Sequence, residues 1–404
     1  MGPQVVSSAW EVELDRWLEP FLLRLQRAEQ RFWAPVYLRG LLLPGERKSV
    51  EPLARRVAPG DVQQLHHFVS TSPWPTAPLE AALVKEADRR VGGREAVLII
   101  DDTALLKQGK HSVGVACQYC GELGKRANCQ SLVSLTLAQR EVPVPVALRL
   151  YLPEIWAKDR ERCTRAGVPE EAIVYRPKWR IALEETDRVR ASGGRFGYVL
   201  ADAGYGMAAE FRSGLSERGL LWAVGLLPTQ HVYAADVELL PPPARARGRP
   251  PKHPVPTRQS VSAEAAIAAL GEPAFRSIAW RKGTKGEIRA DFAAVRVRVA
   301  DGPKNSSGKP LPGEALWLIC ERRANGERKY YLSNLPPKTR LRTLARIIKA
   351  RWVCEQAHEQ MKNELGLDHF EGRNWRGLHH HALLCMLAYA FLQHQRLRLA
   401  ERGK

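Results

Sequence analysis

The sequence predicts a mixed α/β protein with a helical N-terminal region and a β-rich subdomain inserted into its α/β core. Three observations lead to this prediction. Apolar residues recur at helical spacing in residues 1–92, short apolar runs of strand length follow, and alternating apolar segments reappear after a Pro-rich stretch. A length of 404 residues also suits two or three domains.

The N-terminal region, residues 1–92, is predicted to be helical and basic. Its amphipathic segments are separated by Pro and Gly, which break helices. These segments are VELDRWLEPFLLRLQRAEQRF, SVEPLARRV and APLEAALVKEADRRV.

The first part of the core, residues 93–227, is predicted to begin with strands and to end with an α/β unit. The strands are expected in REAVLIID, HSVGVACQYC, SLVSLTLAQ and VPVALRLYLP. The unit follows with helix PKWRIALEETDRVRAS, strand FGYVLAD ending in the turn AGYG, helix MAAEFRSGLSERG and strand LLWAVGLL.

The inserted subdomain, residues 228–338, opens with LLPPPARARGRPPKHPVP, which is too rich in Pro and basic residues to pack as a regular element. Strands are then expected in DFAAVRVRVA, EALWLICERR and KYYLSNLP. The second part of the core, residues 339–404, is predicted to form one helix over 339–366 and another over about 377–398.

The charge balance favours a polyanionic partner. The chain has 62 Lys and Arg against 43 Asp and Glu, a net charge of +19, and nucleic acid is the first candidate. The N-terminus has no secretory signal, and the longest apolar run, at 382–392, is shorter than the roughly 20 residues of a membrane span. We therefore expect a soluble, cytoplasmic protein with no membrane partner, whose seven cysteines are reduced.

Three of these cysteines raise the question of zinc. Cys117 and Cys120 form a C-x2-C pair, with Cys129 and His111 nearby. Because a clean second pair is missing, the spacing argues against a zinc site.

Acidic residues end two of the predicted strands, and a third acid lies on the helix near the end of the chain. These are Asp101 or Asp102, Asp202 and Glu355. Carboxylates at strand ends can meet at one edge of a sheet, where they suit Mg²⁺, although each acid taken singly is more often a turn cap. Successive strand residues point to opposite faces, so one of Asp101 and Asp102 is expected in the site.

The helix that carries Glu355 has a polar line along it. At 100° per residue, Arg351, Glu355, His358 and Lys362 fall within a narrow arc. The line is either a solvated face with an exposed ion pair, worth a few tenths of a kcal/mol, or one wall of a site.

The order strand-Asp, strand-Asp, β-rich insertion and then a helix reading R-W-x-x-E-x6-K resembles the DDE-type insertion-sequence transposases, whose catalytic domain has the RNase H-like fold. The branch with a β insertion has Tyr, Arg, Glu and Lys on this helix, and here Ile348 occupies the Tyr position. The resemblance extends over residues 35–395. It includes DDTALLKQGKHSVGVACQYCGELGKRANCQ, YLPEIW followed by DRER, DAGYG, and ELGLDHFEGRNWRGLHHHALL.

The resemblance implies roles for individual residues. Asp101, Asp202 and Glu355 are expected to be the catalytic acids and to hold two Mg²⁺ ions, with Mn²⁺ as a substitute. Arg351 and Lys362 are expected to contact DNA phosphates. His358 contacts DNA, assists proton transfer or is a bystander.

The resemblance also implies partners and a reaction. The first partner is double-stranded DNA, which includes the terminal inverted repeats, bound with the help of residues 1–92, and the target DNA. The second partner is another copy of the chain, in a synaptic homodimer. The reaction is hydrolysis at the element ends, with or without a hairpin, followed by strand transfer. A bacterial, nucleoid-associated protein is expected. The alternatives are a nuclease of the same fold that never joins DNA and a domesticated transposase that binds DNA without catalysis.

The segment RARGRPPK at 245–252 is a separate candidate for DNA binding. Its Arg247-Gly-Arg249 core resembles an AT-hook, which inserts Arg side chains into the narrow minor groove. The alternative is a flexible basic linker that contacts phosphates without reading sequence.

Overall fold

The computed structural model describes residues 9–242, 254–283, 286–305 and 308–402, and the chain divides into two compact units. The first unit is Met1–Phe196 together with Trp352–Lys404, and the second is Gly197–Arg351. Each unit combines helices with strands, as expected for a mixed α/β protein.

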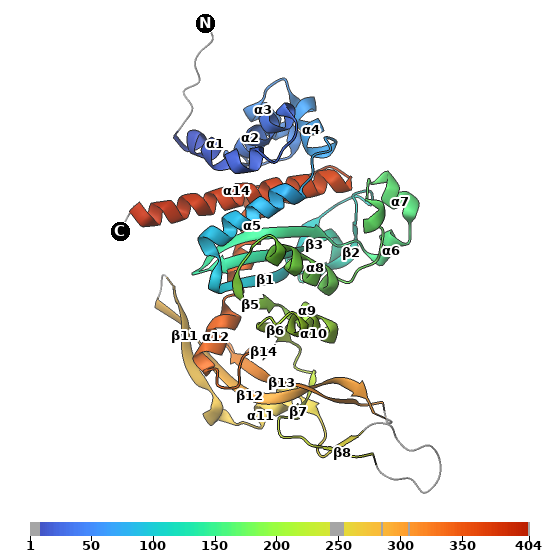
Figure 1. Ribbon diagram of the computed structural model, residues 1–404, viewed down its shortest axis with the longest axis vertical. Coiled ribbons are helices and arrows are strands. Elements are labelled where there is room, and N and C mark those ends of the chain that lie inside the picture. Colours follow the sequence, from blue (N-terminus) through green and yellow to red (C-terminus); the bar gives the residue numbers. More distant parts are fainter. Residues whose placement is uncertain (1–8, 243–253, 284–285, 306–307, 403–404) are drawn as a thin grey trace. The chain divides into compact units, whose positions relative to one another are not determined.

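Within the described residues, the first unit contains the N-terminal helices, four strands and the two C-terminal helices (Figure 1). Its helices are α1 (Ala9–Leu22), α2 (Ala28–Leu42), α3 (Val50–Val57), α4 (Val62–Ser70), α5 (Ala77–Val91), α6 (Glu154–Ala157), α7 (Arg160–Arg165), α8 (Lys178–Ala191), α13 (Trp352–Asn363) and α14 (Trp375–Arg402), with a 3-10 turn at Glu170–Ala172. Its strands are β1 (Gly93–Leu106), β2 (Ala116–Cys120), β3 (Lys125–Gln139) and β4 (Val142–Leu150). The predicted helices of residues 1–92 are confirmed, and so are the predicted strands between 94 and 152, with two differences in their bounds. Strand β1 continues past Asp101 to Leu106, and β2 begins at Ala116, with residues 111–115 in a turn.

Strand β3 organises the sheet of this unit. It pairs antiparallel with β1, β2 and β4. The register with β1 places Asp101 opposite Ser134 and Asp102 opposite Val133. This register decides which face of the sheet each acid occupies.

Helix α14 is the centre of the core in the first unit. It lies between helices α1–α4 and the sheet (Figure 1) and packs against α2, α4, α5 and β4. All residues from Gly377 to Phe391 are buried, which explains why this part of the helix has no Lys, Arg, Asp or Glu. Within the described residues, no helix has the length and hydropathy to cross a membrane.

Three consecutive histidines of α14 are buried, and two of them, His379 and His381, have hydrogen bonds that suit a neutral ring. The Nδ1 of His379 donates to the Trp375 carbonyl at 2.9 Å, and the Nε2 of His381 donates to the Gly366 carbonyl at 2.9 Å. The other ring nitrogen of His381 accepts from the Tyr37 hydroxyl at 2.9 Å. Burial lowers the pKa of both histidines to about 4, so both rings are neutral near pH 7.

Acidification is therefore expected to destabilise the protein. Because the pKa in the folded state is lower than the pKa of about 6.5 in the unfolded chain, stability is complete above pH 6.5 and is lost as the pH falls toward 4, by at most about 1.4 kcal/mol per pH unit for each histidine. Urea unfolding followed by Trp fluorescence at several pH values measures this loss. His66→Gln, on the surface of α4, is the matched control and should keep the dependence of the parent. A parent protein equally stable across this interval would contradict the prediction.

The second unit contains the remaining strands and four helices of the described chain. The strands are β5 (Phe196–Ala201), β6 (Trp222–Leu226), β7 (His231–Ala234), β8 (Leu239–Leu240), β9 (Val255–Pro256), β10 (Val261–Ser262), β11 (Arg276–Gly283), β12 (Gly286–Lys304), β13 (Pro310–Arg322) and β14 (Arg328–Ser333). The helices are α9 (Ala203–Gly206), α10 (Ala209–Glu217), α11 (Ala263–Ala268) and α12 (Leu341–Lys349), with a 3-10 turn at Glu272–Ala274. The order of the main sheet is β5-β6-β14-β13-β12-β7-β10, with β11 on β12. The strands predicted in the insertion are confirmed.

One predicted helix is wrong. The segment 339–366 forms two helices, α12 and α13, separated by a turn at Ala350 and Arg351. Helix α12 buries Leu344, Ala345, Ile347 and Ile348, whereas α13 buries Val353, Cys354, Ala357, His358 and Met361. On one continuous helix these two apolar stripes would lie roughly 140° apart at 100° per residue, so a break lets each helix bury its own stripe.

Candidate active site

The two acids of β1 point to opposite faces of the sheet, as strand geometry requires. Asp102 faces α8, where its carboxylate forms an ion pair of 2.5 Å with Lys178. Asp101 lies on the same face as its cross-strand neighbour Ser134. Its Oδ1 accepts the backbone N–H of Asp102 at 2.8 Å.

Helix α13 covers the Asp101 face. The Cys354 thiol donates to Oδ2 of Asp101 at 3.5 Å, and Nε2 of His358 lies 2.8 Å from the Ser134 hydroxyl. Glu355 follows Cys354 directly and is exposed. The first unit therefore brings Asp101 to the part of α13 that carries Glu355.

The polar line predicted along α13 is only partly present. Arg351 lies in the turn before the helix, because α13 begins at Trp352. His358 is 7% exposed, so it does not lie on a solvated face and its contact with Ser134 anchors α13 to β3. Lys362 forms an ion pair of 2.7 Å with Glu122. The site roles predicted for these residues stay predictions.

Asp202 belongs to the second unit, where it directly follows β5. Its Oδ1 accepts the backbone N–H of Tyr205 at 3.2 Å and caps the short helix α9. The glycines of this turn let it pack against β6, since a Cβ on Gly206 would lie 1.9 Å from the Gly225 carbonyl oxygen. The carboxylate is therefore held at the end of a strand, as predicted, and also acts as a turn cap.

Ile348 occupies the position that has Tyr in the family that the sequence resembles. Its side chain is buried with the apolar stripe of α12 and is 5% exposed. The side chain at this position packs in the second unit, and it has no polar group that could contact a phosphate.

Among the side chains of the described ranges, no three His, Cys, Asp or Glu residues are grouped so that they could hold a metal ion. Cys117 is exposed, whereas Cys120 and Cys129 are buried. A C-x2-C pair on the regular strand β2 places its two thiols on opposite faces, which argues against zinc.

The basic segment with Arg247 and Arg249 lies outside the described residues. The hypotheses of an AT-hook and of a basic linker therefore both stay predictions. Sequence reasoning missed Lys178 as the partner of Asp102, because the two residues are far apart in the chain and no local pattern joins them.

These observations define a mixed α/β protein. In its first unit, Asp101 in the middle of the buried strand β1 faces α13, the helix that carries a second acid, Glu355. The family described as DDE superfamily endonuclease matches residues 20–287, about two thirds of the chain, and the chain belongs to this family.

Two further comparisons give similar proteins. The chain is 32% identical over 196 residues to the "Probable transposase for insertion sequence element IS701" of Microchaete diplosiphon. The aligned region covers 46% of this chain and 48% of that protein. The chain thus matches about half of the length of this curated relative. A cryo-EM structure of a piggyBac transposase synaptic complex with hairpin DNA matches 98% of this chain and 74% of its own, with 10% identity and a TM-score of 0.47. A TM-score this low does not define the fold, so the RNase H-like core stays a prediction, as do the domain boundaries.

Proposed function

We propose that this protein is a DNA transposase that cleaves DNA at the ends of a mobile element and transfers the resulting 3′-hydroxyl ends to target DNA. The observation that carries the proposal is the contact of 3.5 Å between Asp101 and Cys354. This contact associates Asp101, the first predicted catalytic acid, with the segment of α13 that carries Glu355, the last one. Membership of the DDE superfamily endonucleases and similarity to the IS701 transposase support it.

The proposed catalytic acids are Asp101, Asp202 and Glu355, which would hold Mg²⁺ or Mn²⁺. Their carboxylate oxygens are the donors that hard divalent cations prefer. Two bound ions would supply activation of the attacking oxygen and stabilisation of the leaving oxygen. The protein would contribute position and charge, since Arg351 and Lys362 would contact DNA phosphates by charge-assisted hydrogen bonds. Lys362 would exchange its ion pair with Glu122 for a phosphate.

Cleavage and joining of labelled DNA test this function. The parent protein is incubated with Mg²⁺ and duplexes that carry the ends of its own element, either intact or pre-cut with a free 3′-hydroxyl. Cleavage of the intact ends and joining of the pre-cut ends would support a transposase. Cleavage without joining would identify a nuclease, and binding with neither reaction would identify a non-catalytic DNA-binding protein. Both of these results would overturn the proposal.

The assignment of Asp101 gives a separate prediction. Asp102→Asn is expected to keep most of the cleavage activity, because Asp102 is held by Lys178 on the opposite face of the sheet. Asp101→Asn makes the same chemical change one residue away and is expected to lose activity. Initial rates with Mg²⁺ compare the two variants, and the reverse order would transfer the catalytic role to Asp102.

A further inference from the structure

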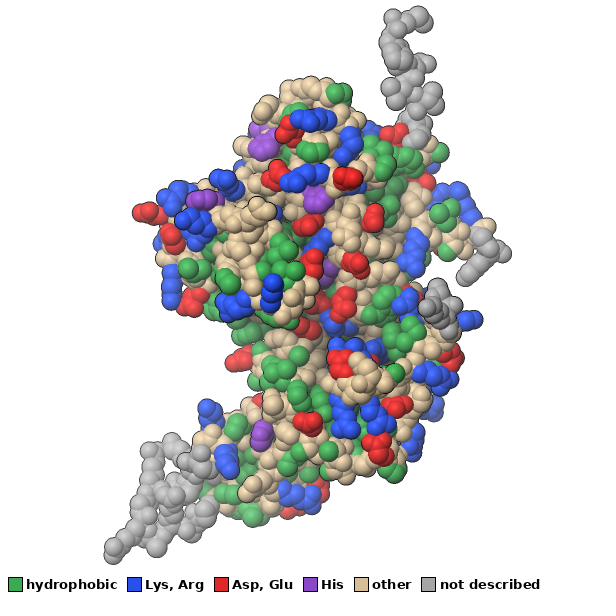
Figure 2. Space-filling model, turned by 180° about the vertical axis from the view of Figure 1, so that it is seen from behind, with side chains coloured by type: hydrophobic (Ala, Val, Ile, Leu, Met, Phe, Trp, Pro, Cys, Tyr) green, Lys and Arg blue, Asp and Glu red, His purple; other side chains and the backbone are tan. Residues whose placement is uncertain are grey.

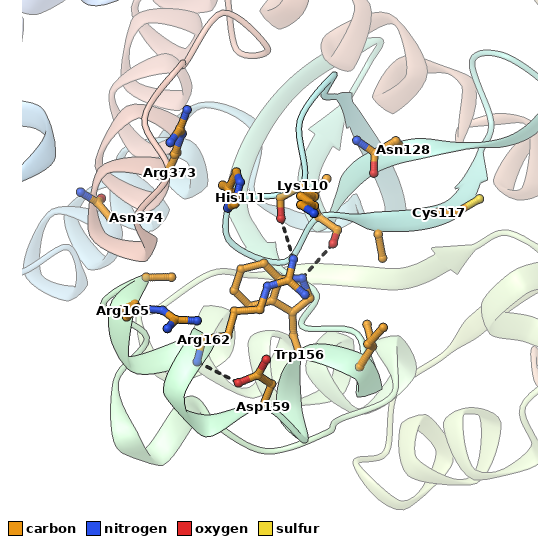
Figure 3. A pocket seen from close by; sticks show the side chains of 14 residues that line it. Lys110, His111, Cys117, Asn128, Trp156, Asp159, Arg162, Arg165, Arg373 and Asn374 are labelled. Carbon is orange, nitrogen blue, oxygen red and sulfur yellow. Dashed lines mark hydrogen bonds between the residues drawn. The ribbon is translucent and has the colours of Figure 1, made fainter.

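A basic hollow lies in the first unit, and none of the proposed catalytic acids lines it. Its volume is about 780 Å³, and it is open to solvent. Most of its lining comes from three stretches of the chain (Figure 3): the loop and strand after β1, helices α6 and α7, and the residues before α14. Asn128 of β3 completes it. These stretches contain KHSVGVACQ, EIW with DRER, and GRNW, motifs of the resemblance that the catalytic site does not use.

The charge of the hollow is strongly asymmetric. Four cationic side chains line it, and Asp159 is its single carboxylate. The four cations, which define the basic hollow from here on, are Lys110, Arg162, Arg165 and Arg373. In the space-filling view, Lys and Arg side chains gather over the α6–α7 region, with fewer acidic ones (Figure 2).

Arg162 is held in place by the protein itself. Its guanidinium lies over the Trp156 ring at 3.7 Å and donates to the Lys110 carbonyl at 2.6 Å (Figure 3). The Asp159 carboxylate accepts the Arg162 backbone N–H at 2.9 Å and caps α7, and the Trp156 indole donates to the Val115 carbonyl at 2.8 Å. A guanidinium fixed in this way loses little side-chain entropy when it binds an anion.

The other three cations are available to a partner. Lys110, Arg165 and Arg373 are all exposed, and within the described part of the chain no ion pair occupies their side chains. Many other surface cations are paired with acids, for example Lys362 with Glu122. Three unpaired cations around a fixed guanidinium provide positive charge that the fold itself does not neutralise.

We propose that the basic hollow binds the phosphate backbone of double-stranded DNA. This inference rests on the proposed function, in which DNA is the substrate, and adds a contact surface to it. Phosphate oxygens are the partners of Arg and Lys in most protein–DNA contacts. Trp156 is 1% exposed and covered by Arg162, so it offers no stacking platform for the bases of a single strand. The basic hollow is therefore better suited to bind the backbone of a duplex than to bind single-stranded DNA.

The dependence of binding on salt tests the proposal. Arg165→Ala combined with Arg373→Ala removes two charges from the hollow, and Arg24→Ala combined with Arg190→Ala removes two exposed, unpaired charges elsewhere in the same unit. Fluorescence anisotropy measures the affinity for a labelled duplex of mixed sequence at several salt concentrations. The hollow variant is expected to bind more weakly, and the slope of log K against log[salt] should fall by about 1.8, or about 0.9 for each lost phosphate contact.

Further variants and competitors make each outcome informative. Arg165→Lys with Arg373→Lys keeps the charge and should keep the slope of the parent. The proposal is overturned if the alanine variant of the hollow has the slope of the parent or of the control. It is also overturned if poly-glutamate competes for the hollow while duplex binding is unchanged, because the partner would then be an acidic protein segment.

Failure of this inference can be distinguished from failure of the proposed function. A parent protein that binds no duplex would reject both. A parent that binds and cleaves DNA, together with a hollow variant of unchanged slope, would reject the hollow alone. Thermal unfolding of each variant identifies one that is not folded.

Discussion

Glu355→Gln is expected to lower the rate of Mg²⁺-dependent DNA cleavage by roughly a thousandfold, the effect of losing about 4 kcal/mol of transition-state stabilisation. The substitution keeps the size of the side chain and removes its charge. Glu355 is exposed on α13 directly after Cys354, whose thiol contacts Asp101. A neutral amide there would be a poor ligand for a divalent cation.

Glu359→Gln is the matched control for this variant. Glu359 is also exposed on α13, one helical turn after Glu355, so the two variants change the net charge and the helix equally. Glu359→Gln should cleave at nearly the rate of the parent. Duplex binding by Glu355→Gln should be as tight as that of the parent or tighter, since a negative charge near the phosphates is removed. Equal loss in both variants, or none in Glu355→Gln, would remove Glu355 from the active site.

The elements around this site could be predicted because their patterns are local. The apolar run before Asp202 forms β5, as predicted, and the run before Asp101 forms the first part of β1. The strand end predicted at Asp101 is wrong, because β1 continues to Leu106 in its pairing with β3. The opposite faces of Asp101 and Asp102 follow from strand geometry alone. In each case the deciding feature is the spacing of apolar residues within about ten positions of the chain.

Features that depend on distant residues could not be predicted in this way. The ion pair of Asp102 with Lys178 and the burial of His358 against Ser134 join segments far apart in the sequence. The break before α13 did leave a signal, since the apolar stripe changes side between Ile348 and Val353. The signal for the basic hollow is weaker. Its three motifs are visible in the sequence, but nothing in the sequence shows that they lie together in the folded protein.

A buried charge network holds the helices of the first unit to its sheet. Arg149 of β4 donates both terminal nitrogens to the Glu80 carboxylate of α5, at 2.6 and 2.5 Å, and its Nε donates to Glu185 of α8 at 2.8 Å. Burial alone would raise the pKa of Glu80, but the hydrogen bonds and charge of Arg149, with the charge of Arg188, lower it below the usual value. The Glu80 side chain is 2% exposed, so it stays ionised only because of these partners.

Arg149→Met is therefore expected to lower the free energy of unfolding by about 3 to 5 kcal/mol, because it leaves the charge of Glu80 buried without its main partner. Arg188 lies 3.7 Å from Glu80 and cannot replace a bidentate pair. Combining Arg149→Met with Glu80→Met should recover much of the loss, since Glu185 keeps its bond of 2.7 Å to Arg188 and apolar residues fill the site. Urea unfolding of the parent and both variants measures these differences. If the double variant were less stable than Arg149→Met by a further comparable amount, the loss would come from packing and not from an isolated buried charge.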